Sequence, residues 1–315
     1  MRRLDKLITL ARRESENSGD VSSTAGIPDD EFVQWANEGQ EFLQNKVETI
    51  DHDIFAAEDF IDVVANQEAY EIDRRSMLKA NIISCEFSYT GQAPDYVKLR
   101  RTTFQERDTS TIPLNPTHYI MRSGYILLNP IPTTSVTNGI RIVYAKKVDR
   151  IDRRRAVVDA VVLATNAITS LSLDVASTDP VFIAADVTVD DYICIVDRNG
   201  VVKMRNIPIS AVNSTTGDVT VVPGFTFGVG ETISVGDYVV AGKDTTTHSE
   251  FADNCEHFLV QWMVFKAFKR DSSDDAIGKE KEIEGIWQAI IGQYADENND
   301  VEYIPILNRR YFNAF

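Results

Sequence analysis

The sequence has 315 residues, of which 43% are hydrophobic and 25% are charged. These proportions, with 16 Gly and 10 Pro residues, exclude a fibrous or wholly disordered chain and indicate a folded protein with a sizeable core. The formal net charge is -16, which excludes a protein that coats nucleic acid along its whole surface.

The cysteines and the apolar runs indicate the cellular compartment in which the protein is assembled. Cys85, Cys194 and Cys255 lie far apart in the sequence and are odd in number, so we expect no disulfide framework. The N-terminal apolar stretch is too short and too charged for a signal peptide, because Arg12 and Arg13 interrupt it. The sequence contains no run of about 18 apolar residues, so we expect no membrane-spanning segment. We therefore expect assembly in a reducing cytoplasm and no membrane partner.

The first 55 residues predict two helices. Leu4, Leu7, Ile8 and Ala11 recur at helical spacing, and a polar, glycine-containing stretch then breaks the pattern. A second helix begins after Pro28, where three acidic residues favour a helix N-terminus. Its apolar face consists of Phe32, Trp35, Ala36, Gly39, Phe42, Leu43 and Val47.

From residue 60 to residue 148 the apolar period changes to two. Short β-rich runs alternate with Gly, Pro and Asn turn signals. The run Tyr119-Ile-Met-Arg-Ser-Gly-Tyr-Ile-Leu-Leu128 predicts a tight hairpin that turns at Ser123 and Gly124. A small antiparallel sheet is the expected result.

A basic run follows this sheet. Clustered Lys and Arg side chains attract phosphate or acidic protein surfaces, so the run is a candidate for an inter-subunit or phosphate contact. The alternative is a solvated linker, because charge runs are common in linkers. The run consists of Lys146, Lys147, Arg150, Arg153, Arg154 and Arg155.

Residues 156–243 are rich in Val, Ile and Thr and have regularly spaced turn signals. This pattern predicts an all-β module, either an Ig-like sandwich or a small barrel. Helical periodicity returns at Phe251, with one apolar stripe before the break at residues 271–275 and a second stripe after it. The expected fold class is therefore α+β, with a four-helix core assembled from both chain ends and the all-β module inserted.

The last 20 residues combine acidic, polar and aromatic residues that fit no helix or hairpin pattern. An aromatic tail that cannot bury itself usually docks on a neighbour. We therefore divide the chain into core segments at residues 1–154 and 246–295, an inserted domain at 155–245 and a docking tail at 296–315. The candidate docking residues are Tyr303, Ile304, Pro305, Ile306, Leu307, Arg309, Arg310, Tyr311, Phe312 and Phe315.

Motifs that suggest chemistry are weak in this sequence. Cys255 and His257 lie two residues apart on a predicted helix and would face opposite sides, which predicts a buried thiol beside a solvated imidazole. His248 and Glu250 have the spacing of a zinc deaminase motif but lack its cysteine half, so a helix cap or a polar loop cluster is expected. The glycines of residues 224–230 precede no helix, and the acidic groups at 29–31, 190–191 and 274–275 are expected mainly at helix starts. We expect no enzyme activity, no cofactor and no metal.

Several segments, taken in order, resemble the head-to-tail adaptor (connector or ring) proteins of tailed bacteriophages. The resemblance lies in the helix pair of residues 7–15 and 24–44, the strand runs 67–72 and 95–99, the hairpin of 119–132, the run 139–144, and the helix start of 249–260 with the break that follows it. These blocks span the chain except for residues 155–244, which smaller adaptors lack.

The resemblance implies a virion structural protein of the neck, at the interface between head and tail. It implies a ring, commonly of twelve subunits, that binds beneath the portal protein, presents a surface to a tail tube, nozzle or other tail component, and lets genomic DNA pass without sequence-specific binding. In such proteins the C-terminal tail typically reaches into the portal. A second hypothesis is a surface-displayed ligand- or glycan-binding module on a virion structural protein, with residues 156–243 as the binder.

Overall fold

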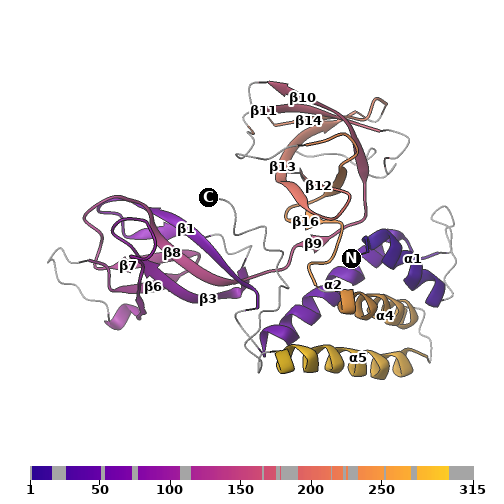
Figure 1. Ribbon diagram of the computed structural model, residues 1–315, viewed down its shortest axis with the longest axis horizontal. Helices are drawn as coiled ribbons and strands as arrows, with labels where there is room; N and C mark the ends of the chain where they lie inside the picture. The colour runs from indigo at the N-terminus through magenta and orange to yellow at the C-terminus, as the bar shows by residue number, and fades with distance from the viewer. Residues whose placement is uncertain are drawn as a thin grey trace. The chain divides into compact units, whose positions relative to one another are not determined.

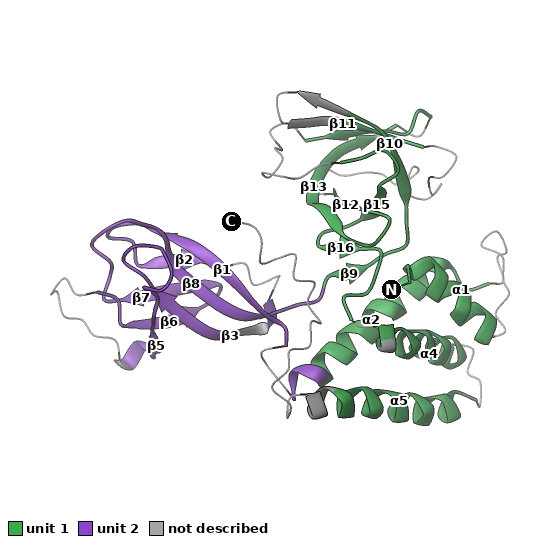
Figure 2. Ribbon diagram, viewed as in Figure 1, with its two compact units in different colours: residues 1–46, 149–315 green, residues 47–148 purple. Residues whose placement is uncertain are grey.

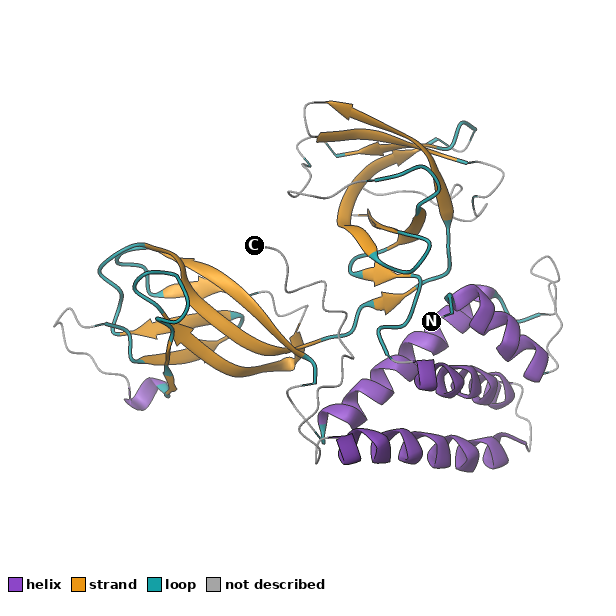
Figure 3. Cartoon of the chain, viewed as in Figure 1, coloured by secondary structure: helices purple, strands orange, loops and turns teal. Residues whose placement is uncertain are grey.

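The computed structural model combines helices and strands in one chain, as the predicted α+β class requires (Figure 3). The described residues are 2–15, 26–50, 54–72, 77–106, 115–164, 167–174, 178, 191–213, 215–222, 225, 233–251, 253–270 and 275–297. The chain divides into two compact units (Figure 2). Unit 1 contains Met1–Lys46 and Asp149–Phe315, and unit 2 contains Val47–Val148.

Four helices lie in the described residues, two before the strands and two after them, as predicted (Figure 1). They are α1 (Leu4–Glu14), α2 (Asp29–Glu48), α4 (Asp253–Arg270) and α5 (Asp275–Glu297). Helix α2 begins after Pro28 with three acidic residues in its first turn, where the positive end of the helix dipole favours them. Its predicted apolar face is buried at Phe32, Ala36, Leu43 and Val47.

Helices from the two chain ends contact one another within unit 1. Helix α1 packs against α4, and α4 packs against α5. On α2, the ring of Phe42 lies 4.9 Å from that of Trp262 on α4 and 6.3 Å from that of Trp287 on α5, measured between centroids. Gly39, one turn before Phe42, lets the Trp262 ring approach the α2 backbone.

Unit 2 is built from two four-stranded sheets, where the sequence predicted one small antiparallel sheet. The first has the order β1-β8-β3-β4 and the second the order β2-β7-β6-β5. The chain passes between sheets over very short segments: Leu99 alone separates β4 from β5. The strands are β1 (Ala56–Val63), β2 (Ala69–Glu71), β3 (Met77–Phe87), β4 (Val97–Lys98), β5 (Arg100–Arg101), β6 (His118–Arg122), β7 (Tyr125–Asn129) and β8 (Val136–Lys146), with a 3-10 turn η1 (Phe104–Glu106) after β5.

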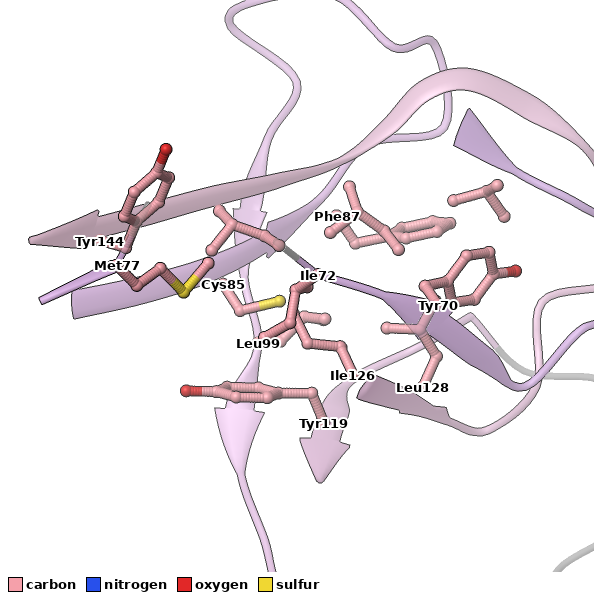
Figure 4. Close-up of a cluster of buried hydrophobic side chains, with 13 residues drawn as sticks. Tyr70, Ile72, Met77, Cys85, Phe87, Leu99, Tyr119, Ile126, Leu128 and Tyr144 are labelled. Carbon is pink, nitrogen blue, oxygen red and sulfur yellow. The ribbon is translucent and has the colours of Figure 1, made fainter. Parts of the chain in front are cut away.

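The pairing within unit 2 is antiparallel except between β5 and β6, which run parallel. The predicted hairpin is confirmed as β6 and β7, and both turn residues, Ser123 and Gly124, have positive φ, as a two-residue hairpin turn requires. Side chains from both sheets form one buried core (Figure 4). It includes Tyr70, Cys85, Phe87, Tyr119, Ile126, Leu128, Ile140 and Ile142.

The inserted all-β module is a closed six-stranded barrel with the order β10-β11-β14-β13-β12-β15. Of the two predicted forms, the structure therefore has the small barrel. The first and last strands close it, with Ala156 opposite Val239. The strands are β10 (Ala156–Ala164), β11 (Ala167–Leu173), β12 (Asp191–Val196), β13 (Val202–Val212), β14 (Asp218–Val221) and β15 (Tyr238–Ala241). Its core contains Val158, Leu171, Ile193, Ile195, Ile207 and Val219.

A short parallel pair marks where the chain enters and leaves the barrel. Strand β9 (Arg150–Ile151) pairs with β16 (Thr245–Thr246). Because β9 lies between β8 and β10, and β16 lies between β15 and α4, the segments by which the chain enters and leaves the barrel lie side by side. Four members of the basic run, Arg150, Arg153, Arg154 and Arg155, therefore lie in or next to β9 at this junction.

Candidate interaction sites

Two arginines of the basic run form ion pairs with the start of α2 and with their own segment. Nη1 of Arg153 lies 3.3 Å from Oδ2 of Asp29, and Nη2 of Arg155 lies 2.9 Å from Oδ1 of Asp30. Their side chains are only 16% and 13% exposed. For these two residues the solvated-linker alternative is wrong, because their guanidinium groups are enclosed by carboxylates 124 and 125 positions earlier in the sequence.

Asp152 is the buried carboxylate of this junction. Its oxygens accept hydrogen bonds from Nε of Arg155 at 2.9 and 3.1 Å, from the backbone N–H of Arg153 at 2.8 Å, and from that of Ala241 at 3.2 Å. A buried carboxylate needs such donors, since desolvation penalises its charge. The aspartate therefore connects the entry to β10 with the end of β15.

The other members of the basic run lie in more varied surroundings. Lys146 ends β8 and Lys147 follows it. Arg150 is exposed, with its backbone N–H donating to the carbonyl of Asp244 at 2.8 Å. The guanidinium of Arg154 lies 5.6 Å from the ring centroid of Tyr238, within the range of a cation–π interaction. The inter-subunit or phosphate role of the run stays a prediction.

The His248 segment is a polar loop cluster, as expected. The His248 ring is buried, and its Nδ1 lies 2.8 Å from the hydroxyl of Thr247. The ring packs against Gly200, where a Cβ atom would lie 2.4 Å from Nδ1. Burial lowers the pKa of His248 to about 4, and the positive charge of Arg3 adds to this effect. A histidine with such a pKa is neutral at physiological pH.

Ser249 and Glu250 complete this junction. The hydroxyl of Ser249 donates to Oε1 of Gln40 at 2.9 Å, and a carboxylate oxygen of Glu250 accepts from the backbone N–H of Asp149 at 3.2 Å. Nη2 of Arg205, on the barrel, lies 2.5 Å from the carboxylate of buried Asp149. These contacts join α2, the barrel and the segment before α4.

The three cysteines are free thiols inside the fold. All three are buried, and burial raises the pKa of Cys85 to about 12. On α4, Cys255 is fully buried while His257 is exposed, which confirms the predicted placement. Buried thiols with raised pKa values hold little of the reactive thiolate form.

The remaining candidates divide between described and undescribed residues. The acids at 29–31 start α2, as predicted. No group of three or more metal-ligating side chains is found within the described residues. Among the described helices, none is sufficiently long and apolar to cross a membrane. Asp190, Asp274, most of the glycine-rich run 224–230 and the whole docking tail from residue 303 lie outside the described residues.

Sequence analysis missed two charged edges in unit 2. Strand β1, the turn after it and β2 carry five acidic residues, Glu58, Asp59, Asp62, Glu68 and Glu71. Strands β4 and β5 carry Lys98, Arg100 and Arg101, all exposed. One signal was available: residues 54–72 contain no Lys or Arg. The pairing that makes both segments edge strands was not visible in the sequence.

The comparison with known families gives the class of the protein, an adaptor protein of bacteriophages. The matching family model is described as SU10 adaptor protein and covers residues 2–160. The chain therefore belongs to the SU10 adaptor protein family, and the resemblance to phage head-to-tail adaptors is confirmed. A search of curated proteins found no match.

Proposed function

We propose that this protein forms a ring beneath the portal in the virion neck, where it joins the DNA-filled head to the tail. Membership of the SU10 adaptor protein family carries this proposal. The portal protein is then the partner on the head side, and a tail tube, nozzle or other tail component is the partner on the tail side. The copies of a closed ring contact one another through heterologous surfaces, repeated around one axis.

The proposed core of each subunit is a four-helix arrangement built from both chain ends. The contacts of α1 with α4, of α4 with α5, and of Phe42 with Trp262 and Trp287 support it. In this division residues 1–154 and 246–295 form the adaptor core and 155–245 the inserted barrel. The pairing of β9 with β16 supports the insertion, because it brings the two crossings into one strand pair. The barrel then faces outward or toward tail components.

The charge of the chain suits a conduit for DNA. With a net charge of -16, subunits around a channel repel the phosphate backbone, so genomic DNA passes without adhering. Binding to DNA would be neither tight nor sequence-specific. The exposed Arg150 of the basic run is then available to an acidic neighbour in the ring.

The C-terminal tail is the proposed portal-docking segment. Residues 303–315 contain four aromatic residues and two adjacent arginines, Arg309 and Arg310. Aromatic and arginine side chains are the groups that most often carry binding energy at protein interfaces. A partner surface with apolar pockets and acidic groups fits this segment.

Truncation of the tail tests the proposal. Removal of residues 303–315 from the full chain should abolish co-sedimentation with portal rings of the same virion, and the urea midpoint of unfolding should not change. A matched control replaces Asn308 and Asn313 by Ala, while the test variant replaces Tyr311 and Phe312 by Ala. Loss of binding only in the aromatic variant supports docking. Undiminished binding of the truncated chain would refute the role of the tail, and neck particles without cyclic copies would refute the ring.

A further inference from the structure

One edge of unit 2 is acidic. Among the strands that the structure describes, β1 pairs with β8 alone and is an edge of the first sheet, and β2 is likewise an edge of the second sheet. The five residues between β1 and β2 hold the two edges together, and the Tyr70 hydroxyl donates to the carbonyl of Val64 at 3.0 Å in that connection. Five carboxylates lie along this edge, and no cation lies within residues 54–72.

The carboxylates of β1 differ in their partners among the described residues. Glu58 lies 3.6 Å from Nη1 of Arg141. Asp59 accepts the N–H of Phe60, and Asp62 accepts the N–H of Asn138 at 2.7 Å. Within the described residues, Asp59 and Asp62 form no ion pair. Their charges therefore remain available to a partner.

The opposite edge of unit 2 is basic. Strands β4 and β5 end the two sheets on the side away from β1 and β2. Lys98, Arg100 and Arg101 are exposed there, and no ion pair of theirs occurs among described residues. The guanidinium of Arg122 lies 5.5 Å from the ring centroid of Phe104, just after β5, and adds a fourth cation.

Exposed apolar side chains accompany the charges on both edges. Val64 is 49% exposed on the acidic side, and Val97 and Phe104 are 63% and 48% exposed on the basic side. Charged groups around exposed apolar side chains are typical of a protein–protein interface. Unit 2 as a whole is nearly neutral, with 13 acidic and 11 basic residues, so the separation of charge, rather than its total, distinguishes the two edges.

The distribution of charge favours contacts between unlike edges of two copies over contacts between like edges. Two acidic edges repel each other, as do two basic edges, so a two-fold dimer through either edge is disfavoured. An acidic edge attracts a basic edge of another copy. This contact is heterologous, and its repetition generates a ring where the rotation closes.

We propose that unit 2 of each copy binds unit 2 of the next copy, with the acidic edge of β1 and β2 against the basic edge of β4 and β5. The inference rests on the proposed ring and assigns one of its subunit contacts. The partner is thus a second copy of this chain.

Charge reversal in the full chain tests the contact. The acid-reversed variant carries Asp59→Lys and Asp62→Lys, and the base-reversed variant carries Arg100→Glu and Arg101→Glu. Each variant alone should lose ring assembly on portal rings, with association between copies weakened at least roughly tenfold. A 1:1 mixture should recover assembly with alternating copies, because every contact again joins opposite charges. Native mass spectrometry measures the composition.

The mixture separates misfolding from a lost contact, since an unfolded variant cannot be rescued by its counterpart. The matched control for the acid-reversed variant, Asp159→Lys with Asp218→Lys on the barrel, makes the same change of charge and should assemble as the unmodified chain does. Rings that form normally with either reversed variant alone would overturn the edge contact and leave the ring intact. If the unmodified chain binds no portal and forms no ring, the proposed function itself fails.

Discussion

A single buried histidine makes the stability of unit 1 depend on pH. Burial, aided by Arg3, lowers the pKa of His248 from 6.5 to about 4 in the folded chain, although Asp197 acts in the opposite direction. Between these values the unfolded chain binds a proton that the folded chain does not. The part of the stability that depends on His248 is therefore fully present above pH 6.5 and is lost as the pH is lowered toward 4.

We expect His248→Asn to reduce this loss. Between pH 7 and pH 4.5 the unmodified chain should lose roughly 2 kcal/mol more stability than the variant does. Urea unfolding followed by tryptophan fluorescence measures the difference, because Trp35, Trp262 and Trp287 all lie on helices of unit 1. His257→Asn, on the exposed side of α4, should keep the pH profile of the unmodified chain. Identical profiles for all three proteins would contradict the assignment.

The contact between α2 and α4 depends on a glycine. A Cβ atom placed on Gly39 would lie 2.9 Å from two atoms of the Trp262 ring, which is closer than packed side chains approach. Gly39→Ala gains up to about 1 kcal/mol of helix propensity but incurs about 1–3 kcal/mol of overpacking. We expect a net destabilisation of about 1 kcal/mol in urea unfolding.

For a glycine on α5, we expect that substitution by alanine stabilises the chain. Nothing lies within 4 Å of a Cβ placed on Gly285, so Gly285→Ala should stabilise the chain by about 0.5–1 kcal/mol through propensity alone. The two substitutions are chemically identical and both lie inside helices. The same sign of effect at both positions would show that Trp262 does not restrict α2.

Local patterns predicted the elements, but the partners of those elements came only from the structure. The helical spacing of Leu4, Leu7 and Ile8 and the Ser123 and Gly124 turn signal were sufficient for α1 and for the β6–β7 hairpin, because both depend on neighbouring residues. Closure of the barrel by Ala156 and Val239 and the pairing of Arg153 with Asp29 join residues far apart in the sequence. No local period contains that information.

At the scale of the whole molecule, charge is distributed unequally between the two units. Unit 2 has 13 acidic and 11 basic residues of the chain's 48 and 32, so nearly all of the net charge of -16 belongs to unit 1. Unit 1 therefore contributes most of the repulsion toward DNA in the proposed channel. Unit 2 is free of large net repulsion between copies, which suits a contact between neighbouring subunits.

The two units also have separate hydrophobic cores, and this separation gives a test of their folding. The core cluster of unit 2 and that of the barrel share no residue, and Ile126 and Ile195 are fully buried in them. Truncation of a buried isoleucine to alanine costs about 2–5 kcal/mol. We expect Ile126→Ala to lower hydrogen-exchange protection in β6, β7 and β8, and Ile195→Ala to lower it in the barrel strands.

Mass spectrometry of exchanging amides in the native full chain measures both effects in one experiment, since local opening is reported peptide by peptide. Each variant serves as the control for the other, because both remove the same atoms from a fully buried site. Protection that falls in the barrel after Ile126→Ala would mean that the two units open as one cooperative body. Protection lost only around the substituted core would mean that unit 2 and the barrel can open independently, each while the other stays folded.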